Sequence, residues 1–223
     1  MPMKFQGTNP QRDFQLIETL RWTPADGYYL LGLHLERLQR SASELGFACD
    51  LPRILQELEV GTRGHSMPRR VRLLLHTDGH TDLTTHPFEL SASGAPVRCA
   101  LSHKQVDSRD PLLRHKTTRR ALFDDEHRYF HEATGADEVL FTNEKGQLTE
   151  GSRSSLFVRV GNRLLTPPLD SGLLDGVLRR HLLRTRADVF ETPLSPDDMA
   201  TAEQLFVGNS LRGLRPAIYP GQS

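Results

Sequence analysis

The sequence is poor in the features that mark secreted, membrane-bound or nucleic-acid-binding proteins. Its 223 residues contain only two cysteines, Cys49 and Cys99, which are too few for a disulfide framework. No run approaches the roughly 18 apolar residues of a membrane span, and the N-terminus has no apolar signal core. Lys plus Arg and Asp plus Glu are equal at 28 each, so the chain has no general electrostatic attraction for nucleic acid or membranes. We therefore expect a cytoplasmic protein with neither kind of partner.

A metal site is also not indicated. The chain has ten histidines, but they are scattered along it. His76, His80 and His86 come closest to a cluster, and no pair of cysteines lies near them. Zinc sites normally combine closely spaced His and Cys ligands. We therefore interpret these histidines as structural or solvated, and expect no metal.

The length allows a sizeable core, in one large domain or two small ones. Hydrophobic residues make up 37% and charged residues 25% of the chain, which is typical of a globular protein. Residues 1–12 are polar and are expected to form a loosely attached leader.

The first half of the chain predicts a small α+β domain over residues 1–106. Period-two alternation of bulky residues predicts a strand at 14–22, followed by a short strand at 28–31. Apolar residues at helical spacing, closed by Gly46, predict a helix at 34–46. The other elements expected here are a helix at 52–60 and strands at 71–76, 81–85 and 97–101. Residues 107–115 are polar and contain Asp110-Pro111, which is typical of an interdomain connection.

The second half, residues 116–223, predicts a larger domain of mixed composition. Helices are expected at 118–134 and 176–187, and another begins at 195–198 with a capping-box pattern. Strands are expected at 138–142, 147–150, 155–160, 163–166, 189–192 and 204–207. The whole chain is therefore predicted to be a two-domain α+β protein.

The central feature is Lys116, within the basic run Arg114–Arg120. By itself such a run usually marks a solvated surface, and it lacks the interleaved aromatic residues of a nucleic-acid site. Four other segments change this interpretation: His34–Leu38 with Arg37, Leu148–Ser152 with Glu150, Gly172–Gly176, and Gly208–Ser210.

Together these segments supply what an aldehyde-phosphate cofactor requires. A lysine amine forms a Schiff base with the aldehyde, and a partly desolvated site favours the neutral amine that this needs. The phosphate favours a bidentate guanidinium and free backbone N–H groups. A carboxylate should face the ring nitrogen, because the ring acts as an electron sink only while that nitrogen is protonated.

In order and spacing, these five segments resemble the fold-type-IV (class IV) family of pyridoxal-phosphate enzymes, over about residues 14–216. The resemblance implies a two-domain fold like that of D-amino-acid aminotransferase, pyridoxal 5'-phosphate as cofactor, a small-molecule substrate and a homodimer. It also implies that Lys116 carries the cofactor and moves protons, that Arg37 holds the phosphate, and that Glu150 faces the ring nitrogen. For Arg37 the alternative is a snorkelling side chain. The other implied cofactor contacts are Leu174, Gly176, Val177, Leu178, Asn209 and Ser210.

Three departures from the family pattern bear on the activity. Ser155 stands where Asn is common, and Leu178 stands where many members have Thr. Ala121 replaces the tyrosine that branched-chain transaminases carry five residues after the lysine. Aminodeoxychorismate lyases tolerate an aliphatic residue there, and the segments 14–22, 115–120 and 208–213 look most like lyase domains.

We therefore expect a lyase that converts 4-amino-4-deoxychorismate to 4-aminobenzoate and pyruvate in folate synthesis. Arg21 and Arg212 are the candidate anchors for the substrate carboxylates. Two alternatives remain open: a branched-chain or D-amino-acid transaminase, and a non-catalytic binding domain on the same fold. The presence of Lys116, Arg37 and Glu150 together argues against the second.

Overall fold

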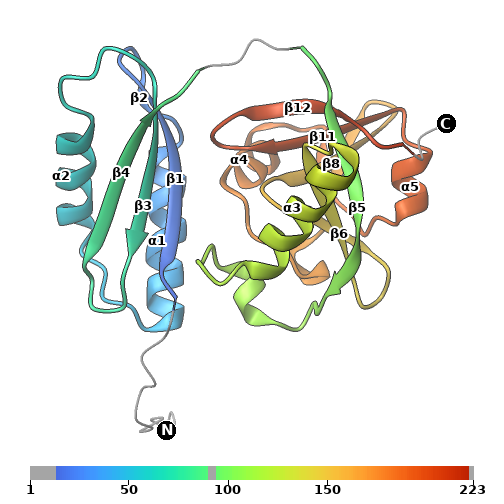
Figure 1. Cartoon of the computed structure of the whole chain (residues 1–223), viewed down its shortest axis with the longest axis horizontal. Coiled ribbons are helices and arrows are strands. Elements are labelled where there is room, and N and C mark those ends of the chain that lie inside the picture. The colour runs from blue at the N-terminus through green and yellow to red at the C-terminus, as the bar shows by residue number, and fades with distance from the viewer. Residues whose placement is uncertain (1–13, 90–93, 221–223) are drawn as a thin grey trace, which may run out of the picture.

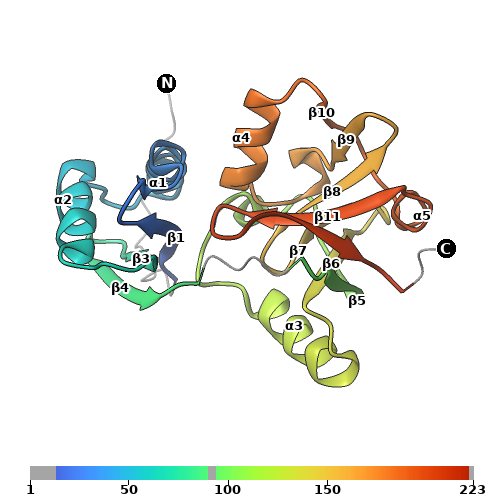
Figure 2. The same cartoon turned by 90° about the horizontal axis from the view of Figure 1, so that it is seen from above.

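The computed structural model describes residues 14–89 and 94–220, and its strands form two separate sheets (Figure 1). The expected leader at 1–12 lies outside the described residues. The first sheet has four antiparallel strands in the order β2-β1-β3-β4, and α1 and α2 cover one of its faces (Figure 2). The bounds of these elements are β1 (Leu16–Thr23), β2 (Gly27–Tyr28), α1 (Leu31–Leu45), α2 (Leu51–Thr62), β3 (Arg69–Leu75) and β4 (Thr81–Pro87).

The alternating pattern of β1 explains how this first part packs. Leu16 and Leu20 are both 1% exposed and belong to a hydrophobic cluster that also contains residues of both helices and β3. Helix α1 ends at Gly46, which adopts a left-handed conformation (φ 71°), and α2 begins at Asp50, whose side chain accepts a hydrogen bond from Arg53 N. The predicted helices and strands of this part are therefore present, although the strand expected at 28–31 is shorter because α1 already begins at Leu31.

The second sheet has eight strands, in the order β10-β9-β8-β11-β12-β5-β6-β7. It is mixed, since β5 pairs in parallel with both β6 and β12, and β9 in parallel with β10. Its strands are β5 (Val97–Val106), β6 (Glu138–Asn143), β7 (Leu148–Gly151), β8 (Ser155–Val160), β9 (Arg163–Thr166), β10 (Val189–Glu191), β11 (Gln204–Asn209) and β12 (Gly213–Ile218). Its helices are η1 (Pro111–Arg114), α3 (Ala121–Thr134), η2 (Leu169–Ser171), α4 (Val177–Thr185) and α5 (Pro196–Ala200).

Hydrophobic side chains pack on both faces of this second sheet. One face carries a cluster that includes Leu140, Val158 and Val207, and Met199 of α5 belongs to the same cluster. On the other face Phe141 packs in a cluster with Phe130 of α3, and further clusters join the sheet to α4. The nearly continuous burial of β6, β7 and β8 follows from this coverage. In the part of the chain that the structure describes, every helix is too short or too polar to cross a membrane.

One strand lies in a different sheet from the one expected. The strand predicted at 97–101 is present, but as β5 it pairs with β6 and β12 of the second sheet rather than with the N-terminal strands. Alternation along a strand identifies its buried face but does not identify its neighbours, so this pairing was not available from the sequence. We therefore propose that the division between the two domains lies between β4 and β5, and not at residue 106.

The segment around Lys116 is attached to the first sheet. The helix expected from residue 118 begins only at Ala121, and residues 116–118 run beside β1 instead. Ile17 N donates to Lys116 O at 2.8 Å, and Thr118 N donates to Gln15 O at 2.9 Å. Leu16 and Thr117 form an isolated antiparallel bridge. A strand of the first part thus fixes the backbone of a residue that belongs, in sequence, to the second.

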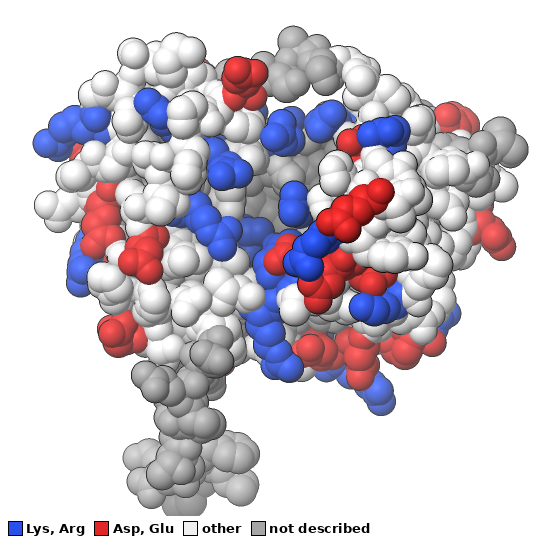
Figure 3. Space-filling model, viewed as in Figure 1, with Lys and Arg blue, Asp and Glu red and all other residues white. Residues whose placement is uncertain are grey.

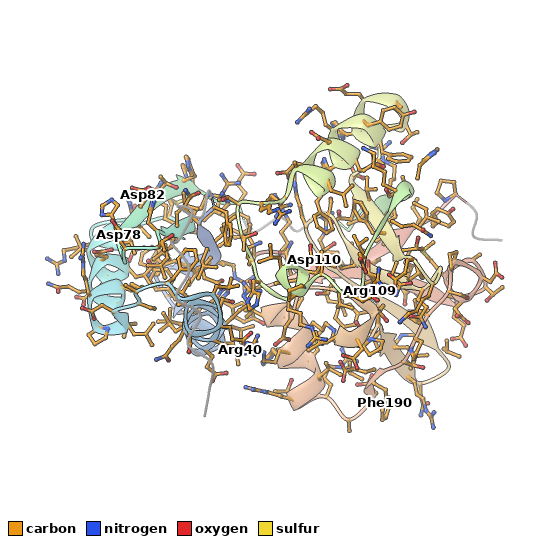
Figure 4. All side chains as sticks on the ribbon, turned by 90° about the horizontal axis from the view of Figure 1, so that it is seen from below. Arg40, Asp78, Asp82, Arg109, Asp110 and Phe190 are labelled. Carbon is orange, nitrogen blue, oxygen red and sulfur yellow. The ribbon has the colours of Figure 1, made fainter. Side chains whose placement is uncertain are left out.

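Helices α1 and α4 complete the junction through charged side chains. Arg40 lies on the side of α1 that faces the second part (Figure 4). Its guanidinium donates at 2.9 Å to the side chain of Asp175, which lies just before α4. Glu36 of α1 lies 3.4 Å from the Arg180 guanidinium of α4. These pairs join the two parts at the level where α4 begins.

The backbone before α4 depends on Gly172. This glycine has a φ of 86°, and a Cβ added to it would lie 2.6 Å from Ser108 Cα. We expect Gly172→Ala to lower the free energy of unfolding by roughly 1–3 kcal/mol, because both the backbone strain and the close contact must be relieved. Gly146→Ala is the matched control: its φ is 74°, but nothing lies within 4 Å of the added Cβ. Denaturant unfolding that gave equal losses for the two variants would contradict this explanation.

Candidate active site

A cavity lies between the two parts of the molecule, around Lys116. Figure 3 shows this face of the molecule hollowed between the two parts, with Lys and Arg side chains around the hollow. The residues that line the cavity belong to β1, α1, the segment before α3, the β7–β8 loop, the start of α4 and the end of β11. The lining residues are Thr19, Arg37, Asp110, Leu112, Leu113, His115, Lys116, Thr117, Arg119, Arg120, Phe123, Glu150 to Ser155, Leu174, Gly176 to Leu178 and Gly208 to Ser210.

Lys116 is partly buried and lines this cavity, and its amine has no hydrogen-bond or ion-pair partner among the described residues. Burial, followed by the charges of Arg37 and Arg120, lowers the pKa of this amine from 10.5 to about 8. Of the other two arginines in the basic run, Arg114 pairs with Asp170 at 2.9 Å and Arg119 is exposed. A substantial neutral fraction near pH 8 makes this amine suitable as a nucleophile or a base.

Glu150 is the second unusual ionisable group in the cavity. The side chain is buried at the end of β7, and Leu174 N donates to its Oε1 at 2.9 Å. Burial raises the pKa of the Glu150 carboxyl to about 7, although the hydrogen bond from Leu174 and the charge of Lys116 act in the opposite direction. A buried carboxylate with one hydrogen bond and no ion pair would be stabilised by a cationic group placed against it.

Arg37 lies at the cavity, but most of its hydrogen bonds are directed to Glu18. Its Nε and Nη2 donate to the two carboxylate oxygens of Glu18 at 2.8 and 2.6 Å, and Nη1 lies 3.4 Å from Asp175 O. His34 Nδ1 donates to the same carboxylate at 2.6 Å. Burial alone raises the pKa of the Glu18 carboxyl, but Arg37 and His34 outweigh it and hold this pKa at about 2. The bidentate edge expected for a phosphate therefore faces Glu18, which leaves Nη1 as the freest part of the guanidinium.

The start of α4 supplies the backbone donors that the sequence suggested. Gly176 precedes Val177 and Leu178, whose N–H groups belong to the first turn and have no carbonyl partner within the helix. A Cβ on Gly176 would lie 2.5 Å from Ser155 Oγ. The backbone at the start of α4 can therefore pack this closely against Ser155 only because residue 176 has no side chain. Such a helix start favours an anion.

The remaining residues from the sequence prediction also reach the cavity. Leu174 lines it and binds Glu150 through its backbone. Ser210 is buried and lines it as well. The Asn209 side chain is occupied: its Nδ2 donates to Arg153 O at 3.1 Å, and its Oδ1 accepts from Leu211 N and Arg212 N. Asn209 therefore fixes the loops of the site through these bonds.

The two expected substrate anchors have different positions. Arg21 is not among the residues that line the cavity, and its guanidinium lies 4.1 Å from the centroid of the Tyr29 ring. Arg212 lines an adjoining cavity and lies over the ring of Phe88 at 5.5 Å. Only Arg212 is thus close to the site.

Sequence reasoning missed two carboxylates that organise the site. Glu18 was visible as the single charged residue on the apolar face of a predicted strand, and a buried charge requires a partner. Glu138, at the start of β6, accepts hydrogen bonds from the hydroxyls of Ser152 and Ser154 and from the backbone N–H groups of Val139 and Arg153. No local pattern marks Glu138, because the serine hydroxyls and the Arg153 N–H that it binds lie in a loop more than ten residues away.

Comparison with known proteins identifies the family. Residues 15–218 match the family described as amino-transferase class IV. A solved structure from Mesorhizobium loti, provisionally named an amino-acid aminotransferase, is 43% identical, covers 93% of this chain and 100% of its own, and superimposes with a TM-score of 0.88. The chain belongs to the class IV aminotransferase family.

Two curated relatives carry different names. A Schizosaccharomyces pombe protein, provisionally named aminodeoxychorismate lyase, is 29% identical over 191 residues, which are 82% of this chain and 81% of that protein. A Thermotoga maritima protein, provisionally named branched-chain-amino-acid aminotransferase, is 27% identical over 211 residues, which are 90% of this chain and 75% of that protein. The expected fold, enzyme class and cofactor are therefore confirmed, whereas the reaction is not resolved between lyase and transaminase.

Enzymes of the class IV family use pyridoxal 5'-phosphate, and the lining of the cavity fits this group. The unpartnered amine of Lys116 suits the aldehyde. The start of α4 and the Nη1 edge of Arg37 suit the phosphate, and the singly hydrogen-bonded carboxylate of Glu150 suits the ring nitrogen. Each requirement of the cofactor thus meets a group that lacks a full set of partners.

The lowered pKa of Lys116 predicts a stability effect in the cofactor-free protein. Since the folded-state pKa of about 8 lies below the ordinary 10.5, burying the charged amine costs stability below pH 8, and this cost disappears as the pH rises toward 10.5. Lys116→Met should therefore raise the free energy of unfolding at pH 7, by a value on the order of 2 kcal/mol after allowance for partial exposure. The gain should shrink above pH 8.

Denaturant unfolding of the cofactor-free variant and wild type at pH 7 and pH 10 checks this. Lys145→Met is the control, since Lys145 is 61% exposed. A gain for Lys116→Met that did not depend on pH would show that lost charge is not its cause.

Proposed function

We propose that the protein is a pyridoxal-phosphate-dependent 4-amino-4-deoxychorismate lyase, which releases 4-aminobenzoate and pyruvate for folate synthesis. The observation that carries this proposal is the cationic opening of the cavity. Arg119 and Arg153 line it, both are exposed, and neither guanidinium has an ion-pair partner among the described residues. A substrate with two carboxylates suits such an opening better than an aliphatic amino acid does.

In this proposal the cofactor is held at three points. Lys116 attaches it covalently, the first-turn N–H groups of Val177 and Leu178 together with Arg37 hold its phosphate, and Glu150 faces its ring nitrogen. Glu18 acts on the cofactor only through Arg37, whose orientation it fixes by two hydrogen bonds. Leu174, Gly176 and Ser210 shape the remaining wall, and Asn209 holds the loop that carries Arg153.

The chain's own groups then supply the proton transfers. When bound, the cofactor withdraws electrons from the amine-bearing carbon of the substrate. Lys116, once free, takes the proton from that carbon, which its pKa of about 8 allows near neutral pH. The bond between the ring and the enolpyruvyl oxygen breaks, its electron pair leaves with enolpyruvate, and the ring becomes aromatic. The proton that Lys116 took is returned to the methylene carbon of enolpyruvate, which becomes pyruvate, so no co-reactant is required.

The second candidate is an amino-acid transaminase, which the names of the Mesorhizobium loti and Thermotoga maritima proteins favour. It would use the same cofactor site. Against the branched-chain reaction stands Ala121, in place of the tyrosine of branched-chain transaminases. The homodimer implied by the family resemblance and the cytoplasmic location expected from the sequence composition remain predictions.

Product analysis distinguishes the two reactions. Purified holoenzyme should release 4-aminobenzoate and pyruvate in equal amounts from aminodeoxychorismate, measured by chromatography. With branched-chain or D-amino acids and 2-oxoglutarate, the same preparation should be at least about a hundredfold slower, which corresponds to about 2.7 kcal/mol of transition-state stabilisation. The opposite ranking would reject the lyase in favour of the transaminase.

Glu150→Gln tests the site that both candidates share. Glutamine keeps the shape and a hydrogen bond but removes the charge that keeps the ring nitrogen protonated. We expect turnover to fall at least about a hundredfold, while borohydride reduction still attaches the cofactor to the peptide that contains Lys116.

The matched control is Glu132→Gln on the exposed face of α3. Near-normal turnover of Glu150→Gln, or a label on Lys104 or Lys145, would refute these assignments.

A further inference from the structure

A second cavity, of about 530 Å³, adjoins the one around Lys116. It lies between α3, the start of β5, the β11–β12 turn and the β7–β8 loop. Four residues line both cavities: Arg153, Ser154, Gly208 and Asn209. A single ligand can therefore occupy both, with its reacting amine at Lys116 and its other end in the second cavity.

Three arginines line the second cavity: Arg153, Arg212 and Arg215. None of them forms an ion pair among the described residues, although the charge of Arg215 is close enough to contribute to the lowered pKa of Asp137. The acidic groups of the lining are already engaged: Asp137 pairs with Arg98 at 3.2 Å, and Glu138 accepts the hydroxyls of Ser152 and Ser154. The positive charges of three guanidiniums that line one cavity repel one another, and an anion bound among them would offset this repulsion.

The fold brings these arginines together through Asn209. Its side chain donates to the carbonyl of Arg153 and accepts from the backbone N–H of Arg212, so one amide ties both loops. Arg215 follows on β12, where it pairs across the sheet with Val207. The sheet and its turn thus fix the backbone positions from which the three arginine side chains extend.

We propose that Arg153, Arg212 and Arg215 form a carboxylate subsite for the end of the substrate that lies away from the reacting amine. Guanidinium groups bind carboxylates through paired, charge-assisted hydrogen bonds. The subsite therefore selects amines that carry a remote carboxylate and disfavours aliphatic amino acids, whose apolar end would leave the arginines without partners. This inference deepens the proposed function and rests on it for the identity of the amine.

Binding to the holoenzyme tests the subsite without turnover. Isothermal titration with benzene-1,3-dicarboxylate and with benzoate should show tighter binding of the dicarboxylate, by about tenfold or more. Arg212→Gln and Arg215→Gln should each remove most of that preference, whereas Arg212→Lys should retain part of it. Arg163→Gln, on β9, is the control and should behave as wild type. Circular dichroism should show that each variant is folded.

Kinetics separates failure of the subsite from failure of the lyase. If aminodeoxychorismate is turned over, Arg212→Gln and Arg215→Gln should raise KM about tenfold and change kcat less than about threefold. Wild-type KM in both variants, or equal binding of the two probes, would overturn the subsite and leave the lyase standing. Dicarboxylate preference that depends on these arginines, in a protein without lyase activity, would support the subsite and reject the proposed reaction.

Discussion

The site depends on the backbone pairing between residues 116–118 and β1. Two main-chain hydrogen bonds, of 2.8 and 2.9 Å, extend the first sheet by the segment that carries Lys116. They place the lysine beside Glu18 and Arg37, which belong to the first part, and opposite Glu150 and the start of α4, which belong to the second. Because these are backbone bonds, the position of the lysine does not depend on the flexible charged side chains around it.

Some charged groups of the site are compensated by hydrogen-bonded partners of opposite charge, and two are not. Burying the charge of Arg37 without a partner would lower stability, but Glu18 accepts two hydrogen bonds from its guanidinium. His34 donates a third hydrogen bond to the same carboxylate. Lys116 and Glu150 lack such compensation, and their pKa values move toward neutrality from opposite sides, to about 8 and about 7. Groups held in this way are suited to accept a charged, hydrogen-bonding ligand. Leaving Lys116 and Glu150 without such partners lowers the stability of the cofactor-free protein.

In the proposed function, the residues that select the substrate lie apart from those that hold the cofactor phosphate. Glu150, at the end of β7, lines the cavity around Lys116, and Arg153, three residues later in the β7–β8 loop, also lines the adjoining cavity. Glu138 fixes this loop by accepting hydrogen bonds from the hydroxyls of Ser152 and Ser154 and from the backbone N–H of Arg153. A change in the loop or in the β11–β12 turn could therefore alter the substrate while the cofactor site stayed intact. Such an arrangement accounts for relatives that share the fold but carry the names of different reactions.

The sequence by itself determined most local elements, the family and many of the residues that line the cavity around Lys116, because these are recorded in short-range patterns. Period-two alternation marked β1, helical spacing and Gly46 marked α1, and the segments containing Lys116, Arg37 and Glu150 identified the cofactor chemistry. Only the tertiary structure decided that β5 belongs to the second sheet, that residues 116–118 join the first, and that Glu18 takes the bidentate edge of Arg37. It likewise brought Arg153, Arg212 and Arg215 to one wall and left Arg21 outside the cavity. All of these are contacts between residues far apart in the chain, and a local pattern shows which side chain is buried without showing what it meets.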